Sequence, residues 1–259
     1  MSAMEPIAAR IRLAIAGALG RMGRCVVERA MQDARFALVA ALVAEEPSRV
    51  DGAIPYATNL SEPCDVLIDF TDAQGTRAWV PVCAERRVAM VIGTTGHDAA
   101  DEARIREAAK VIALVKAANF SPGIHLVARA VRELAKQLGA SFDIEIVETH
   151  HRHKVDAPSG TALMLLDELL GARGQSRDSA AFGRLGQTGS RPPGQIGVHA
   201  VRLGDVVGRH EVHFSGDGET ISVQHEAHSR EAFAAGALLA AAWVVGKPPG
   251  LYGMSDVVA

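Results

Sequence analysis

Three histidines and a lysine crowd the segment ETHHRHKVDAPSGTAL, residues 148–163. As a metal site it offers imidazole nitrogens from His150, His151 and His153, but no cysteine pair and no HExxH motif accompanies them. As a polar loop it would only carry solvated charges. A third interpretation uses more of the residues, because a histidine can transfer a proton near neutral pH and Lys154 adds a fixed positive charge.

The turn Pro158-Ser159-Gly160-Thr161 follows directly and has the composition of a helix start. The first backbone N–H groups of a helix have no partner inside it and can bind a carboxylate. A small anion would then lie between Lys154 and the amides of Gly160 and Thr161, and a dicarboxylate would use both. The segment therefore predicts an anion-binding, proton-donating site, with a metal centre and a polar loop as alternatives.

A second segment with possible chemistry is GALGRMG, residues 17–23, between an apolar run and a helical stretch. Its glycines permit a tight turn, so that backbone N–H groups and the positive end of the helix dipole can approach a diphosphate. The spacing G-x-x-G-x-x-G is a variant of the dinucleotide fingerprint and is weak alone, since the same glycines could serve only strand–helix packing. Its position after the first strand favours dinucleotide binding.

The first half of the chain alternates short apolar runs with helical stretches. The runs predict five strands: Ile11–Ala16, Phe36–Ala44, Asp65–Phe70, Val88–Gly93 and Val111–Ala117. Continuous apolar runs are typical of strands buried on both faces of a parallel sheet, which indicates a Rossmann-like, doubly wound α/β domain. Ligands bind beyond the carboxyl ends of such strands, so Gly93–Gly96 and Ala117–Phe120 should border the cofactor crevice.

The pattern changes after Ser121-Pro122, a typical helix start. Helical spacing over Ile124–Leu138 ends at Gly139, and Ser141–His150 then alternates apolar and polar residues like a strand with one buried face. Further on, the pattern predicts a helix over 163–170 and a long Gly- and Pro-rich loop over 171–197. Three strands are then predicted over 197–203, 206–214 and 220–225.

These elements predict two domains. Residues 122–230 should form an α+β domain with an open, mostly antiparallel sheet. Residues 1–121 should form the dinucleotide-binding domain. The apolar helix Arg230–Val245 should return residues 231–259 to that first domain.

The composition argues against several classes of protein. A net charge of −3, with scattered basic residues, gives no electrostatic basis for binding nucleic acid or an anionic membrane. The apolar stretch Ala232–Val245 is shorter than the ~20 residues of a membrane span, and the apolar run after Arg12 lacks a convincing signal-peptide cleavage site. Three widely spaced cysteines without a CxxC pair favour reduced thiols, so we expect a cytoplasmic protein.

Taken together, the motifs resemble the 4-hydroxy-tetrahydrodipicolinate reductase (dihydrodipicolinate reductase) family of bacterial lysine and diaminopimelate biosynthesis. The resemblance runs in order through nearly the whole chain, and the His-His-Arg-His-Lys stretch is its most specific part. The segments that carry it are GALGRMG (17–23), DFT (69–71), VIGTTG (91–96), AANFSPG (117–123), ETHHRHKVDAPSGTAL (148–163), GQTGSRPPGQIG (186–197), GDVVG (204–208) and GLYGMSDV (250–257).

The resemblance implies reduction of the cyclic dicarboxylate made from aspartate semialdehyde and pyruvate to tetrahydrodipicolinate, with hydride from NADH or NADPH. It implies that His150 donates a proton to the ring carbon beside the one that receives hydride, and that Lys154 assists. His151, Gly160 and Thr161 would bind the substrate carboxylates. The cofactor would be held by Gly17, Ala18, Leu19, Gly20, Arg21, Met22, Gly93, Thr94, Thr95, Ala117, Ala118, Asn119 and Phe120. Members usually form homotetramers through the sheet of the second domain, which also binds substrate.

One departure from the family pattern bears on the coenzyme. Many members end the second strand with an acidic residue that binds the adenosine ribose, often followed by arginine for the NADP phosphate. Here Val43 and Ala44 stand at these positions, with Glu45 and Glu46 just beyond. Glu45 could reach a ribose and favour NADH, or Arg21 could meet a 2′-phosphate, so the sequence leaves both coenzymes open.

Two other functions compete with the reductase. A related amino-acid or imine dehydrogenase on the same two-domain plan would need a different substrate segment from residues 148–163. A non-catalytic dinucleotide-sensing protein should have lost His150 or Lys154, and both are present.

Overall fold

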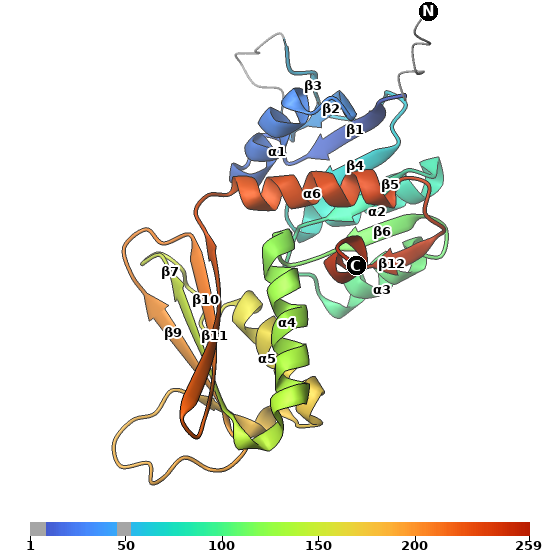
Figure 1. Ribbon diagram of the computed structural model, residues 1–259. Coiled ribbons are helices and arrows are strands. Elements are labelled where there is room, and N and C mark those ends of the chain that lie inside the picture. Colours follow the sequence, from blue (N-terminus) through green and yellow to red (C-terminus); the bar gives the residue numbers. More distant parts are fainter. Residues whose placement is uncertain (1–8, 46–52) are drawn as a thin grey trace, which may run out of the picture. The chain divides into compact units, whose positions relative to one another are not determined.

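The computed structural model describes residues 9–45 and 53–259 (Figure 1). Glu46, named above as the neighbour of Glu45, lies outside the described residues. The chain divides into two compact units, one formed by Met1–Phe120 with Phe233–Ala259 and the other by Ser121–Ala232. Each unit has its own sheet and its own apolar core.

The first unit is built on a seven-stranded parallel sheet in the order β12-β6-β5-β4-β1-β2-β3. Its strands are β1 (Ile11–Ala16), β2 (Phe36–Leu42), β3 (Tyr56–Ala57), β4 (Val66–Asp69), β5 (Ala89–Ile92), β6 (Ala113–Lys116) and β12 (Gly250–Tyr252). All of β4 and the last four residues of β1 are buried, as expected for a sheet covered on both faces. The apolar runs predicted five of these strands but not β3 and β12, which have only two and three residues.

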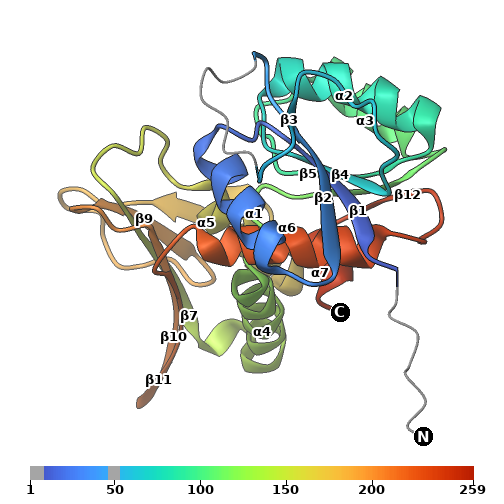
Figure 2. The ribbon, with the colours of Figure 1, turned by 90° about the horizontal axis from the view of Figure 1, so that it is seen from above.

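Helices cover both faces of this sheet. One apolar layer joins it to α1 (Arg21–Gln32) and α6 (Glu231–Val244), and another joins it to α2 (Ala73–Arg86) and α3 (Ala99–Ala108). Figure 2 shows these two helix pairs on opposite sides of the strands. The predicted doubly wound α/β architecture is therefore confirmed, and the short helix α7 (Met254–Val257) follows the last strand.

The second unit contains a five-stranded sheet in the order β11-β10-β7-β9-β8. Its strands are β7 (Asp143–His150), β8 (Ala180–Phe182), β9 (Ile196–Arg202), β10 (Gly208–Gly216) and β11 (Glu219–Ala227). The helices α4 (Pro122–Leu138) and α5 (Gly160–Arg173) pack on one face of the sheet. Every second side chain of β7 is therefore buried. Two short 3₁₀ turns, Gly139–Ser141 and Arg177–Ser179, complete the unit.

This second sheet is mixed rather than mostly antiparallel. β10 pairs with β7 and β11 in antiparallel fashion, but β9 pairs with β7 and β8 in parallel fashion. The helix α5 supplies the crossover that a parallel connection needs. Alternation along β7 predicted one covered face, and it contains no information about the direction of the neighbouring strands.

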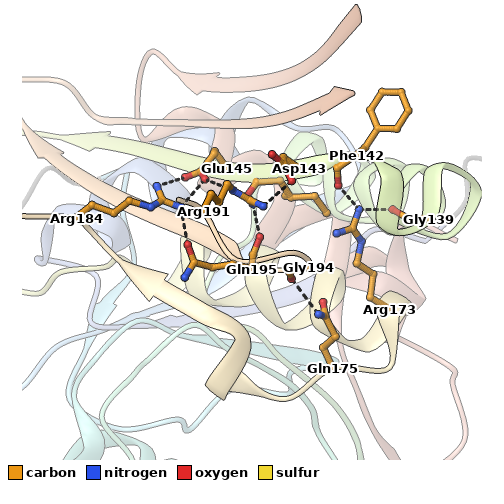
Figure 3. A network of polar contacts seen from close by, with 11 residues as sticks. Gly139, Phe142, Asp143, Glu145, Arg173, Gln175, Arg184, Arg191, Gly194 and Gln195 are labelled. Carbon is orange, nitrogen blue, oxygen red and sulfur yellow. Dashed lines mark hydrogen bonds and ion pairs between the residues drawn. The ribbon is translucent and has the colours of Figure 1, made fainter. Parts of the chain in front are cut away.

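A polar network around Glu145 ties the segment between β8 and β9 to β7 (Figure 3). Glu145 accepts hydrogen bonds from Arg184 (2.8 Å), Arg191 (3.2 Å) and His199 (2.7 Å). Burial raises the pKa of Glu145, but these hydrogen bonds outweigh it and lower the pKa to about 2. Gly197 stands opposite Glu145, where a Cβ would lie 1.7 Å from its carboxylate, so the missing side chain makes room for the network.

Candidate active site

The inward face of β7 changes from apolar to polar along its length. Ile144 and Ile146 belong to the core, and Glu148 and His150 follow on the same face, all four buried. The strand register sets Arg202 of β9 opposite His150, and His210 of β10 opposite Glu148. Three strands thus bring four polar side chains together at one end of the sheet.

Glu148 is fully buried and uses both carboxylate oxygens. Oε2 accepts from Nδ1 of His150 (2.5 Å) and from Nη1 of Arg202 (3.0 Å). Oε1 accepts from Nη2 of Arg202 (3.0 Å) and from the backbone N–H of Ser159 (3.0 Å). Burial raises the pKa of Glu148, but the hydrogen bonds from Arg202 and His150 outweigh it, so the net pKa lies below the ordinary value. The carboxylate is therefore ionised at neutral pH.

His150 is held so that one ring nitrogen is committed and the other is available. A carboxylate can only accept, so Nδ1 carries the hydrogen shared with Glu148 and leaves Nε2 for proton transfer. Burial lowers the pKa of His150, while Glu148 acts to raise it. A Cβ at Gly208 would lie 3.1 Å from Nε2, so this glycine leaves space beside the nitrogen that Glu148 does not engage.

The start of α5 is fixed by the same cluster. Ser159 is the N-cap, and its Oγ accepts from the N–H of Ala162 (3.1 Å) and bonds to Nε2 of His210 (3.1 Å). Burial, followed by the charge of His150, lowers the pKa of His210 to about 3, so this imidazole is neutral. Gly160 and Thr161 are the first two residues of the helix, as the turn composition predicted.

The rest of the histidine-rich segment lies in the loop between β7 and α5. Lys154 Nζ donates to Asp156 Oδ1 over 2.8 Å, so its charge is paired within the loop. The rings of His151 and His153 lie 6.2 Å apart, and Nδ1 of His151 is buried with no hydrogen-bond partner among the described residues. Gly160 is exposed, with open space where a side chain would begin. Within the described ranges, no three His, Cys, Asp or Glu side chains gather into a metal-binding set.

In the first unit, Phe70 joins the loops that follow four parallel strands. Gly17, with φ +79°, would place a Cβ 2.6 Å from the carbonyl oxygen of Phe70, and Gly93 would place one 2.1 Å from its ring. The Phe70 ring also meets that of Phe120 edge to face, 5.8 Å between centroids. The loops after β1, β4, β5 and β6 therefore meet at the carboxyl edge of the sheet, where a ligand is expected.

The glycines of the first loop have different tasks. Gly23 would place a Cβ 2.0 Å from the oxygen of Gly17, so these two serve close packing of α1 on the loop. Gly20 is exposed and is the N-cap of α1, without a side-chain hydrogen bond to the helix. Leu19 and Arg21 on either side are exposed as well. The start of α1 is thus exposed, whereas Gly17 and Gly23 are required by close packing.

The remaining predicted cofactor residues line the same edge of the sheet. Their exposures differ: Ala18, Thr94 and Phe120 are buried, Met22, Gly93, Ala117 and Asn119 are half-buried, and Thr95 and Ala118 are exposed. At the end of β2, Val43 is buried while Ala44 and Glu45 are exposed, so Glu45 presents the only described carboxylate of this short segment.

The sequence analysis did not single out several residues that build these sites. Asp69 is fully buried and accepts from the backbone and hydroxyl of Thr71 and from the hydroxyl of Thr76, which shapes the turn that contains Phe70. Glu148, Arg202 and His210 were given no part in the proton-donating site, and Ser159 was considered only as part of the helix start. The alternation along 141–150 contained one usable signal, because it places Glu148 on the same face as His150.

Two other features concern a cysteine and the helices. Burial raises the pKa of the Cys64 thiol to about 11, which makes it a poor nucleophile. None of the described helices combines the length and the apolar character that crossing a membrane requires.

Comparison with known proteins gives a consistent result over the whole chain. Residues 11–120 match the family model for the N-terminus of dihydrodipicolinate reductase, and residues 123–258 match the one for its C-terminus. The 4-hydroxy-tetrahydrodipicolinate reductases of Myxococcus xanthus and Psychrobacter arcticus are 42% and 41% identical, over 96% of this chain and 97% and 95% of theirs. The dipicolinate-bound dihydrodipicolinate reductase from Paenisporosarcina sp. TG-14 has a similar structure, with TM-score 0.78 and 26% identity, over 96% of this chain and 99% of that one.

Proposed function

Because the chain belongs to the dihydrodipicolinate reductase family, we propose that it reduces 4-hydroxy-tetrahydrodipicolinate to tetrahydrodipicolinate with NADH or NADPH, in lysine and diaminopimelate biosynthesis. The observation that supports this most directly is the His150–Glu148 pair beside the start of α5. It combines a proton donor with a helix start suited to a carboxylate. A related amino-acid or imine dehydrogenase is disfavoured by the match over both halves of the chain.

The first unit is the proposed dinucleotide-binding domain. Its loop Gly17–Met22 fits a diphosphate, because Gly20 leaves the start of α1 without a side-chain cap and both neighbouring side chains are exposed. Gly93–Thr95 and Ala117–Phe120 would line the same crevice. A bound nicotinamide coenzyme supplies the hydride.

The second unit is the proposed substrate-binding domain. His150, when protonated on both ring nitrogens, would donate the Nε2 proton to the ring carbon beside the one that is reduced and would be left as the neutral Nδ1–H tautomer held by Glu148. Gly160 and Thr161 would bind one substrate carboxylate through the start of α5, and His151 would contact a carboxylate as well. Lys154 would assist proton transfer and stabilise negative charge on the substrate.

Lys154 can take this role without a large energetic cost. Its ion pair with Asp156 is partly solvated, since the Asp156 side chain is 57% exposed. Exposed ion pairs contribute only about 0–1 kcal/mol, so a substrate carboxylate can replace Asp156.

We further propose a cytoplasmic homotetramer assembled through the second sheet. Its helices α4 and α5 cover only one face of that sheet. By strand alternation Val201 of β9 points to the other face, where it remains 39% exposed. A dicarboxylate is the expected substrate partner, and the net charge of −3 gives no reason to expect nucleic acid.

The test is the initial rate of NADH and NADPH oxidation, with substrate generated from pyruvate and aspartate semialdehyde by its synthase. Activity with either coenzyme supports the proposed reaction. A higher kcat/KM with NADH would place the ribose at Glu45, and a higher one with NADPH would place a 2′-phosphate at Arg21. Folded protein that binds a dinucleotide but oxidises neither coenzyme would refute the reaction and favour a related dehydrogenase.

A further inference from the structure

We propose that the ion pair between the buried Glu148 carboxylate and the half-buried Arg202 guanidinium positions three parts of the substrate site, which makes both of them positioning residues for the reduction. This inference rests on the proposed function, because it concerns the same site. Glu148 begins the histidine-rich segment and Arg202 lies on β9, and neither was given a part in the proton-donating site from the sequence. Their hydrogen bonds reach His150, Ser159 and Asp156.

Three connections lead from the pair to the predicted site. Glu148 Oε2 accepts from Nδ1 of His150, which orients the proton donor. Glu148 Oε1 accepts from the backbone N–H of Ser159, the N-cap of α5, which fixes the start of the helix. Arg202 Nη2 donates to the backbone carbonyl oxygen of Asp156 (2.5 Å), which fixes the loop that contains Lys154.

The energetics of the pair argue for a role beyond stability. A buried ion pair loses so much hydration that well-packed apolar residues of similar volume are often equally stable. Two positions earlier on the same strand face, Ile146 fills the core in that way. At Glu148 the carboxylate instead receives four hydrogen bonds, two of them from the parallel fork of Arg202. The strand therefore carries a charged residue instead of an apolar one at the position that contacts His150, the start of α5 and, through Arg202, the loop of Lys154.

The surroundings of His150 determine how its titration should respond. The charged and titratable groups that face it are Glu148 on its own strand, Arg202 on β9, His210 on β10 and Lys154 in the following loop. Of these, Glu148 alone raises the pKa of His150, while Arg202 and Lys154 lower it. Loss of the Glu148 charge should therefore move the titration of His150 to lower pH and release its ring orientation.

The decisive variant is Glu148→Gln, measured for kcat, KM and the pH profile of kcat/KM on the full-length protein. Loss of a carboxylate that fixes the tautomer of a catalytic histidine costs about 10²- to 10⁴-fold in kcat. We expect a loss in this range, a shift of the His150-dependent limb to lower pH, and coenzyme affinity within about threefold of wild type. A merely structural role would lower stability without moving the pH profile.

Arg202→Lys is the second variant and serves if Glu148→Gln does not fold. It keeps the charge but loses the fork and the contact with Asp156. We expect it to raise KM at least tenfold, because the loop that contains Lys154 is released.

The matched control is Asp167→Asn on α5. It breaks an exposed ion pair in which Arg177 donates to both carboxylate oxygens, as Arg202 does to Glu148. It should leave all kinetic constants within twofold. The inference is overturned if Glu148→Gln, or Arg202→Lys where the former does not fold, behaves like this control. NMR titration of His150 in ligand-free protein separates the two proposals. An inactive wild-type protein in which Glu148→Gln still lowers the His150 pKa would refute the reaction but support the positioning.

Discussion

A single methyl group at Gly23 should test the dinucleotide loop, because the structure leaves no room for it. A Cβ there would lie 2.0 Å from the oxygen of Gly17 and 2.9 Å from Cα of Ala18, whereas ordinary contact begins at 3.4 Å. All of these atoms belong to the backbone, so no side chain can move aside. Gly17 is itself packed closely against Phe70, because a Cβ built on Gly17 would lie 2.6 Å from the Phe70 oxygen.

In Gly23→Ala the start of α1 must therefore move from the loop by roughly 1.4 Å, taken from the same contact distances. Overpacking of this kind costs about 1–3 kcal/mol of stability. Each hydrogen bond to a charged diphosphate that is lost costs about 1.5–3 kcal/mol, which is about 10- to 10²-fold in a dissociation constant. We expect a folded protein whose dissociation constants for NADH and NADPH rise about 10²-fold.

Titration of nicotinamide fluorescence gives both dissociation constants, and thermal unfolding shows that the variant is folded at the assay temperature. The control is Gly171→Ala within α5, where a Cβ meets nothing within 4 Å. This control should keep coenzyme affinity and gain up to about 1 kcal/mol from helix propensity. Wild-type affinity in folded Gly23→Ala would refute the reasoning, since the loop would then have no part in coenzyme binding.

Three further outcomes are expected. Gly20→Asp should weaken coenzyme binding while the fold is retained, because it sets a negative charge at the exposed start of α1, and fluorescence titration checks this. His150→Ala should lower kcat by about 10²–10⁴-fold with coenzyme affinity unchanged, and a trivial loss in steady-state rates would exclude it as proton donor. The pKa of Glu145 is lowered from 4.5 to about 2. Its contribution of about 2–3 kcal/mol to the free energy of unfolding should therefore be present above pH 4.5 and lost as pH falls toward 2. Glu145→Gln should remove that part of the acid dependence in denaturant unfolding, and an unchanged pH dependence would show that the network around Glu145 is not stabilising.

The fold could be predicted from the sequence where burial on both faces leaves a continuous apolar run. The predicted run Ile11–Ala16 coincides with β1, and the run at 65–70 contains β4. The edge strands β3 and β12 gave no such signal, because two or three residues are too short for a pattern. The parallel pairing of β7 with β9 could not be predicted either, since alternation reports burial but not strand direction.

The candidate site could be predicted only where its residues are neighbours in sequence. The segment 148–163 contains the proposed proton donor, its lysine and the start of α5, and all of them were visible as a motif. Arg202 and His210 come from other strands and reach Glu148 only through the register of the sheet. No spacing along the chain encodes that register.

The two faces of β7 show why the polar residues of this strand need glycines beside them. On the outer face Glu145 lies across Gly197, and on the inner face His150 stands beside Gly208. A side chain at either glycine would enter the space of a polar group whose position is fixed by hydrogen bonds. Gly208, the second glycine of GDVVG, had no task assigned from the sequence, and it keeps space open at Nε2, the nitrogen of the proposed proton transfer. A glycine on a neighbouring strand therefore makes room on each face of β7, for the network that holds a loop on one face and for the proposed proton donor on the other.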